Sequence, residues 1–165
     1  MLSLFCFTNK DCYGKIRVMK RNKIILGILI LAWLCLIWGH SLQPAVVSEG
    51  ESAKWLDVIY RIVPFIDNDD NGMFIVRKAA HFTEYGILGV LLTLEMAFYV
   101  RGWFRRFVEP LLLALSVAFV DETIQLFVVG RSGEVRDMWI DVAGAALAIV
   151  ITLAIIGNRR GKRRY

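Results

Sequence analysis

Four segments of this chain are each apolar over about the length that a helix needs to cross a lipid bilayer. The hydrocarbon core of a bilayer is roughly 30 Å thick, which takes about 20 helical residues. The first segment is free of charge, because no Lys, Arg, Asp or Glu occurs between Ile24 and Ser48. The predicted fold is therefore an all-α integral membrane four-helix bundle. Its expected spans are residues 24–43, 79–100, 108–129 and 138–157.

The first span has an alternative interpretation as a cleaved signal peptide, because Lys20, Arg21 and Lys23 directly precede it. No small-residue cleavage site follows Trp38, and three further apolar segments come later in the chain. These two observations favour a retained helix.

Composition supports the membrane interpretation. Hydrophobic residues make up 57% of the 165 residues and charged residues only 21%, whereas soluble domains are about 45–50% apolar even with glycine counted. A disordered chain and an ordinary soluble enzyme are therefore disfavoured. The three cysteines, Cys6, Cys12 and Cys35, match neither a zinc-site spacing nor a disulfide framework.

The basic residues predict an orientation. Of the 20 Lys and Arg residues, 14 lie before the first span, between the second and third spans, or after the last one. The other six lie in the two remaining connections. Because basic residues stay on the cytoplasmic side, both termini of a multi-pass membrane protein are expected inside. This asymmetry accounts for the net charge of +5 without nucleic acid as a partner.

The first connection, on the predicted outer side, contains a short amphipathic helix. Ser48 and Glu51 fit a capping box at its start, and Pro64 is expected to end it. The apolar residues of this helix recur at helical spacing and are Trp55, Ile59, Ile62 and Val63. Two interpretations stay open: a helix lying on the outer membrane surface, or a lid over a site.

Three regions are expected along the chain. Met19 followed by Lys20 and Arg21 is typical of a bacterial membrane-protein start, so residues 1–19 are interpreted as an N-terminal extension, with the true start codon left open between Met1 and Met19. The transmembrane domain is expected over 20–157, and 158–165 form a basic cytoplasmic tail.

Polar side chains within the spans are the candidate functional residues. An acidic residue at the centre of a membrane helix costs about 2.5–3.5 kcal/mol on insertion scales, so it usually faces a partner or a hydrated cavity. Spacings of three and four residues place these groups on shared helix faces, and the predicted topology brings them to the outer half of the bilayer. The predicted pocket consists of Gln43, Lys78, His81, Glu84, Tyr85, Asp121, Glu122, Gln125, Arg131, Asp137 and Asp141.

The alternative is structural: the carboxyl groups of Asp121 or Glu122 could pair with basic residues of neighbouring helices and hold the helices together. Close packing is also expected on the last span, where Asp141, Gly144, Ala145 and Ala148 form a face of small residues.

The chemistry of this pocket is left open by the residues alone. His81 and Glu84 resemble half of a carboxylate–histidine metal site, which is a weak signal, and no metal or cofactor is expected. The chain contains no H-E-x-x-H, G-x-S-x-G or P-loop motif, so binding is favoured over catalysis while an enzyme stays open. The weak metal-ligand candidates are His81, Glu84, Asp121 and Glu122, with Asp141.

Three sequence blocks together resemble the VanZ-like family of small bacterial membrane proteins. Residues 38–44 (WGHSLQP) are similar to its F-S-x-Q-P ending, and residues 77–89 (RKAAHFTEYGILG) to its K-x-x-H-F-x-x-Y-x-x-L-G block. The third block combines DETIQ at 121–125 and Gly130-Arg131 with the D-x-x-x-D-x-x-G series from Asp137. Two positions depart from the family pattern: His40 stands where an aromatic residue is expected, and Val129 replaces a proline.

The resemblance implies a cell-envelope protein that acts near the outer leaflet. The founding member of the family is associated with teicoplanin resistance by a mechanism that is not established. The leading hypothesis is a non-catalytic protein that binds or shields a lipid-linked cell-wall component. Membrane lipids, such a precursor or the glycopeptide are the expected partners, and Arg131, Arg136 and Lys78 would meet anionic head groups. The alternatives are a membrane enzyme, with or without a metal, and a proton-coupled transporter that would need to form a homo-oligomer.

Overall fold

The computed structural model describes residues 10–60, 69–131 and 133–161, with side chains described from residue 21 to residue 157 of these ranges. This described part is all-helical and contains no strand. The helices are α1 (Lys10–Ser41), α2 (Ala45–Tyr60), α3 (Asp70–Met96), α4 (Trp103–Gln125) and α5 (Val135–Gly161).

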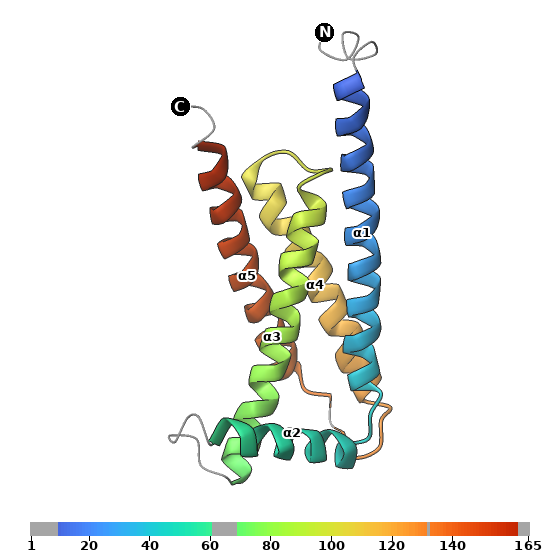
Figure 1. The fold of residues 1–165 in the computed structure, drawn as a ribbon. Coiled ribbons are helices and arrows are strands. Elements are labelled where there is room, and N and C mark those ends of the chain that lie inside the picture. The colour runs from blue at the N-terminus through green and yellow to red at the C-terminus, as the bar shows by residue number, and fades with distance from the viewer. Residues whose placement is uncertain (1–9, 61–68, 132, 162–165) are drawn as a thin grey trace.

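Four long helices, α1, α3, α4 and α5, run side by side, and α2 crosses one end of them (Figure 1). The start of α1 and the end of α5 both lie at the opposite end, on different sides of α3 and α4. The central element is α3, which contacts all four other helices and packs most extensively against α5. Residues separated widely in the sequence therefore meet around α3.

Several helix boundaries differ from the predicted ones, and α3 and α4 end at Met96 and Gln125 rather than at residues 100 and 129. The third helix begins at Asp70 rather than near residue 79, because Asp69 caps it and accepts a hydrogen bond of 2.9 Å from the Gly72 backbone N–H. The predicted capping box at Ser48 and Glu51 is wrong. The α2 helix already begins at Ala45, and the Pro44 carbonyl accepts from the N–H groups of residues 47 and 48 at 3.0 and 3.2 Å.

Several expectations fall on segments outside the described residues. Ile62, Val63 and Pro64 of the predicted amphipathic helix lie there, as do residues 1–9 of the predicted extension and 162–165 of the predicted tail. Residues 10–19 continue into α1 as one helix. The division into extension, transmembrane domain and tail stays a prediction.

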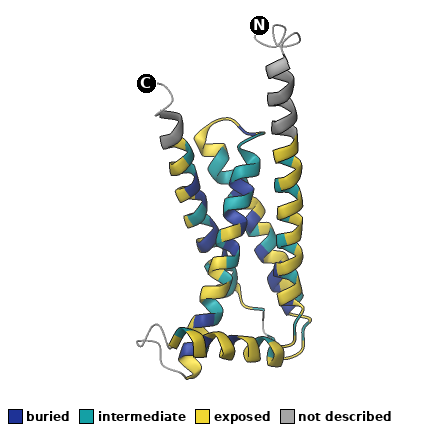
Figure 2. Ribbon diagram, in the orientation of Figure 1, coloured by how far each residue is buried: buried dark blue, intermediate teal, exposed yellow. Residues whose placement is uncertain are grey.

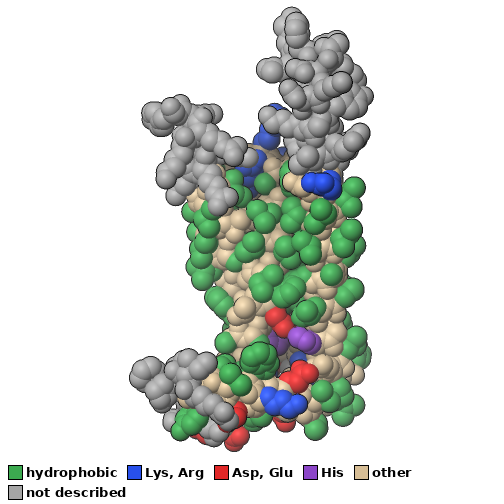
Figure 3. Space-filling view, viewed as in Figure 1, with side chains coloured by type: hydrophobic (Ala, Val, Ile, Leu, Met, Phe, Trp, Pro, Cys, Tyr) green, Lys and Arg blue, Asp and Glu red, His purple; other side chains and the backbone are tan. Residues whose placement is uncertain are grey.

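Apolar side chains cover the outer surface of the long helices, and polar side chains lie between them. Ile24, Leu31 and Phe119 are each more than 60% exposed, whereas Asp121 and Asp141 are fully buried. Figure 2 shows the exposed residues on the outward faces, and Figure 3 shows the resulting apolar surface around the middle of the molecule. A soluble protein rarely exposes so large an apolar patch.

Within the described residues, two helices are long and apolar enough to cross a membrane, over Arg21–Ser41 and Val135–Gly157. Only 11% of the most apolar stretch of the first and 28% of the second is buried in the protein. A core helix of a soluble protein would be mostly buried, so these two helices are candidate membrane spans.

The helices α3 and α5 approach closely through small residues. A side-chain carbon added at Gly89 would lie 2.7 Å from the backbone oxygen of Ala145, and one added at Gly144 would meet the backbone of Phe82. The predicted small-residue face of α5 is thus confirmed as a packing surface. Beside it lie the core residues Tyr85 and Leu88, both fully buried.

We expect Gly89→Ala to destabilise the protein, because its new methyl group collides with backbone that cannot rotate away. Overpacking of this kind costs about 1–3 kcal/mol. Gly86→Ala is the matched control, since its methyl group would make an ordinary contact 3.7 Å from the Gly144 oxygen and would gain helix propensity. Thermal unfolding of both variants in one detergent checks this, and equal melting temperatures would contradict it.

Candidate functional site

A cavity of about 520 Å³ lies between α1, α2 and α3. Its apolar walls include Trp33, Trp55, Ile59 and Ile87, and its polar walls include His40, Ser41, Arg77, Glu84 and Arg131. From Ser41 to Trp33 the cavity follows α1 for about 12 Å at 1.5 Å per residue. The charged groups lie toward the α2 end, where Trp55 and Ile59 of α2 add apolar surface, and Trp33 and Ile87 line the part farther along α1 and α3. The cavity is therefore amphipathic along its length.

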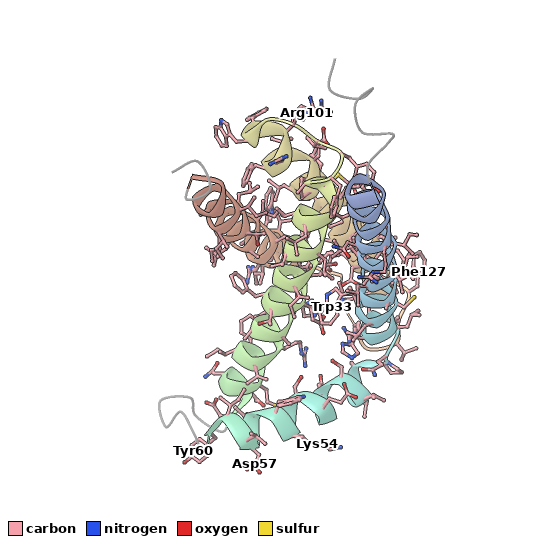
Figure 4. The ribbon with its side chains drawn as sticks, turned by 45° about the horizontal axis from the view of Figure 1, so that its top comes forward. Trp33, Lys54, Asp57, Tyr60, Arg101 and Phe127 are labelled. Carbon is pink, nitrogen blue, oxygen red and sulfur yellow. The ribbon has the colours of Figure 1, made fainter. Side chains whose placement is uncertain are left out.

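The α2 helix forms one wall of this cavity. Its residues Ser52 and Leu56 are buried against the other helices. Lys54, Asp57 and Tyr60 are exposed and point away from them, as Figure 4 shows. Of the two interpretations of this helix, the contacts favour a lid that covers the cavity.

At the polar end of the cavity, Glu84 of α3 contacts two side chains of α1. Its carboxylate Oε1 lies 2.8 Å from Nδ1 of His40 on α1, and its backbone carbonyl accepts a hydrogen bond of 2.9 Å from the Trp33 indole N–H. Figure 4 shows Trp33 on the side of α1 that faces α3. In Figure 3, histidine and acidic side chains appear together at an opening next to α2. These contacts join α1 to α3 and leave part of the polar wall accessible.

The loop after α4 positions Arg131. Gly130 adopts a φ of 78°, which glycine tolerates and other residues rarely adopt. Arg131 then donates from Nε to the Gln43 carbonyl at 3.1 Å and from Nη2 to the His40 carbonyl at 3.2 Å. These carbonyls lie at and just after the end of α1, where helix carbonyls lack their regular partners; the His40 carbonyl also accepts from the Gln43 N–H at 3.1 Å. Burial, and secondarily the nearby Arg77, lowers the pKa of the Arg131 guanidinium.

A buried polar network lies behind the cavity wall. The Ser41 hydroxyl donates to Asp121 Oδ1 at 2.5 Å, and the Gln125 amide donates to Asp121 Oδ2 at 3.3 Å. On the same helix, Glu122 Oε2 accepts from the Glu134 backbone N–H at 2.8 Å. The network thus ties α1 and the loop before α5 to α4.

Two pairs connect α3 to α5. The Lys78 ammonium forms a hydrogen-bonded ion pair with Asp137, and each of these side chains is about 15% exposed or less. One turn farther along, His81 Nδ1 lies 3.4 Å from Asp141 Oδ1. These pairs face each other because α3 and α5 run in the same direction (Figure 1).

The structure divides the predicted pocket residues into two groups. Gln43, His81, Glu84 and Arg131 line the cavity. The remaining seven lie behind it or in the α3–α5 contact, and they are Lys78, Tyr85, Asp121, Glu122, Gln125, Asp137 and Asp141. Lys78 therefore has Asp137 as its partner and is not placed to meet a head group in the cavity.

The predicted set omits several cavity residues, among them Trp33, Glu51 and Arg77. One signal was available: Trp33 and His40 are seven residues apart and therefore share a face of α1. No comparable signal marks Arg77, since its role depends on where α2 crosses α3.

An apolar exterior, buried ionisable groups and two helices able to span a bilayer define a helical membrane protein. The family model described as VanZ/LLP1 matches residues 26–156. The chain belongs to this VanZ family, as its sequence blocks predict. Neither the curated proteins nor the solved structures contain a match to it.

We expect Arg131→Gln to lower the stability by about 1–2 kcal/mol, because it removes hydrogen bonds from a charged donor to the end of α1. Arg136→Gln is the control, since Arg136 is exposed and exposed substitutions change stability by about 0.5 kcal/mol or less. Circular dichroism during heating measures both. Equal loss in the two variants would show that the bonds of Arg131 to the α1 carbonyls are not stabilising.

Proposed function

We propose that this protein is a four-span bundle in the bacterial plasma membrane, with both termini in the cytoplasm, and that its cavity binds the polar head of a lipid-linked cell-envelope component. The observation that carries this proposal is the amphipathic cavity beneath α2, with charged groups at one end and apolar groups along the helices.

The lengths of α3 and α4 support two further spans. They contain 27 and 23 residues, which correspond to about 40 and 34 Å of helix and exceed the roughly 30 Å of hydrocarbon. Their ionisable residues do not oppose insertion, because Asp121, Glu122 and Lys78 face other helices rather than the exterior.

The orientation follows from the charge distribution and the fold together. The basic connection containing Arg101 lies at the end of the molecule opposite α2 (Figure 4), and α1 begins and α5 ends at that same end (Figure 1). If this end is cytoplasmic, then α2 and the polar part of the cavity lie at the outer leaflet.

The cavity lining indicates the chemistry of the ligand. Arg131 and Arg77 line it, and the Nε atom of Arg77 is buried without a hydrogen-bond partner. This donor suits a phosphate or another anionic group. His40 and Glu84 suit hydroxyl or amide groups, while Trp33 suits an alkyl stem. A lipid-linked cell-wall precursor has all three features.

Such binding would lead to resistance because the protein and teicoplanin compete for the same precursor. A precursor held in the cavity is shielded from teicoplanin, whose own lipid chain anchors it at the same membrane surface. The binding requires no reaction of the precursor, so this function is non-catalytic.

The topology can be tested by single cysteines in a background with Cys6, Cys12 and Cys35 replaced. We expect Lys54→Cys on α2 to react with a membrane-impermeant maleimide in intact cells. Arg101→Cys at the opposite end should react only after the cells are permeabilised. The opposite pattern of labelling would refute the proposed orientation.

Filling the cavity tests the binding. We expect Ala80→Trp to abolish binding of a polyprenyl diphosphate to the purified protein, because Ala80 lines the cavity. Ala143→Trp on the exposed face of α5 is the control and should bind normally. Titrating each variant with the diphosphate in detergent, with native mass spectrometry as the readout, measures binding by both.

The same variants are then compared for teicoplanin and vancomycin susceptibility in a sensitive Gram-positive host, at equal membrane levels. Protection against teicoplanin by the natural chain and by Ala143→Trp, but not by Ala80→Trp, is the expected result. Equal diphosphate binding by Ala80→Trp and Ala143→Trp would contradict a role for the cavity.

A further inference from the structure

Three ionisable side chains from three different helices meet behind the cavity wall. They are His81 of α3, Asp121 of α4 and Asp141 of α5, and each offers one ligand atom within 4.8 Å of the others. Both aspartates are fully buried. The cluster is therefore enclosed by protein rather than spread over a surface, where acidic groups commonly gather without a ligand.

The bonding within this cluster is incomplete. His81 Nδ1 and Asp141 Oδ1 lie 3.4 Å apart as an ion pair, but these two atoms and Asp141 Oδ2 are all buried without a hydrogen bond. Native proteins hydrogen-bond the large majority of their buried polar atoms. A carboxylate without such bonds is costly inside a protein, and more so at membrane depth.

A fourth buried polar group lies near this cluster. The Tyr85 hydroxyl is fully buried and also has no hydrogen-bond partner. It lies one helical turn from His81 and interacts electrostatically with both Asp121 and Asp141. Tyr85 is not a member of the His–Asp–Asp cluster, so its unpartnered hydroxyl is an independent indication that something binds between these groups.

The nearby cation of the protein is already engaged. Lys78 pairs with Asp137, so the basic group in direct contact with Asp141 is His81. A divalent cation would balance the charge of the two carboxylates. Asp121 is also held in place, by Ser41 at 2.5 Å and Gln125 at 3.3 Å. Metal-binding carboxylates are typically oriented by such hydrogen bonds from neighbouring residues.

We propose that His81, Asp121 and Asp141 bind one divalent transition-metal ion, with the Tyr85 hydroxyl beside it. One imidazole nitrogen and two carboxylates suit Zn²⁺ better than Mg²⁺ or Ca²⁺, which prefer oxygen ligands alone. Around a tetrahedral Zn²⁺ with ligand distances of roughly 2.0–2.2 Å, the ligand atoms lie about 3.4 Å apart. Ligand atoms that lie up to 4.8 Å apart here would therefore move together when the ion binds.

The metal site adjoins the cavity but is distinct from it. His81 and Ser41 line the cavity, while Asp141 and Tyr85 lie wholly behind it. The ion would join α3, α4 and α5 at the level of the polar part of the cavity. The metal proposal does not depend on the identity of the cavity ligand.

The test uses the full chain in detergent, freed of metal with a chelator and titrated with Zn²⁺ alone in a calorimeter. We expect about one equivalent to bind, and Asp141→Asn and His81→Gln to weaken binding at least about 10-fold. Glu122→Gln is the matched control: Glu122 is a neighbouring buried carboxylate that accepts the Glu134 N–H, and its loss should leave Zn²⁺ binding unchanged.

Absence of stoichiometric binding by the folded natural chain would overturn the proposal, and so would unchanged binding by folded Asp141→Asn. If Asp141→Asn does not fold, Co²⁺ absorption spectra of the natural chain and His81→Gln decide the matter. A spectrum shared by the two would overturn the site, and its loss in His81→Gln would support it. Ala80→Trp should retain the metal. A failure of the cavity proposal can therefore be distinguished from a failure of the metal proposal.

Discussion

The close approach of α3 and α5 is the contact on which the remaining structure depends. Gly89 and Gly144 allow each backbone to lie against the other helix, and α3 and α5 run in the same direction. This approach brings Lys78 to Asp137 and His81 to Asp141. A larger residue at either glycine would separate these pairs as well as the backbones. Small residues with no chemistry of their own therefore determine where the ionisable groups meet.

The membrane accounts for the distribution of polar residues. Lipid offers no hydrogen bonds, so buried polar groups must find partners within the protein. Most of them do: Asp121 is bonded by Ser41 and Gln125, and Glu122 by the Glu134 backbone N–H. Against this background the unpartnered atoms of Asp141 and Tyr85 are informative. Glu122 Oε1 and Glu95 Oε2 are also buried without a partner, but among the described residues Asp141 alone lacks one at both carboxylate oxygens, and a bound cation would explain this.

Much of the fold could be predicted from the sequence, because its signals are local. Apolar length located the four long helices, and the spacing of Asp141, Gly144 and Ala145 indicated the packing face of α5. The start of α2 could not be found from the Ser48 pattern, because Pro44 begins the helix earlier. Helical spacing likewise placed His81 and Tyr85 on one face, but it could not divide that face between cavity and core. This division depends on how α3 is rotated against its neighbours.

The cavity and the buried cluster share a wall, and this has a mechanistic consequence. Ser41 lines the cavity and also bonds Asp121, while His81 lines the cavity and faces Asp141. A ligand that moves either side chain would change the surroundings of the buried carboxylates. Conversely, an ion between those carboxylates would hold His81 in one orientation toward the cavity. Binding at the two sites is therefore expected to be coupled, and by linkage the coupling must be equal in both directions.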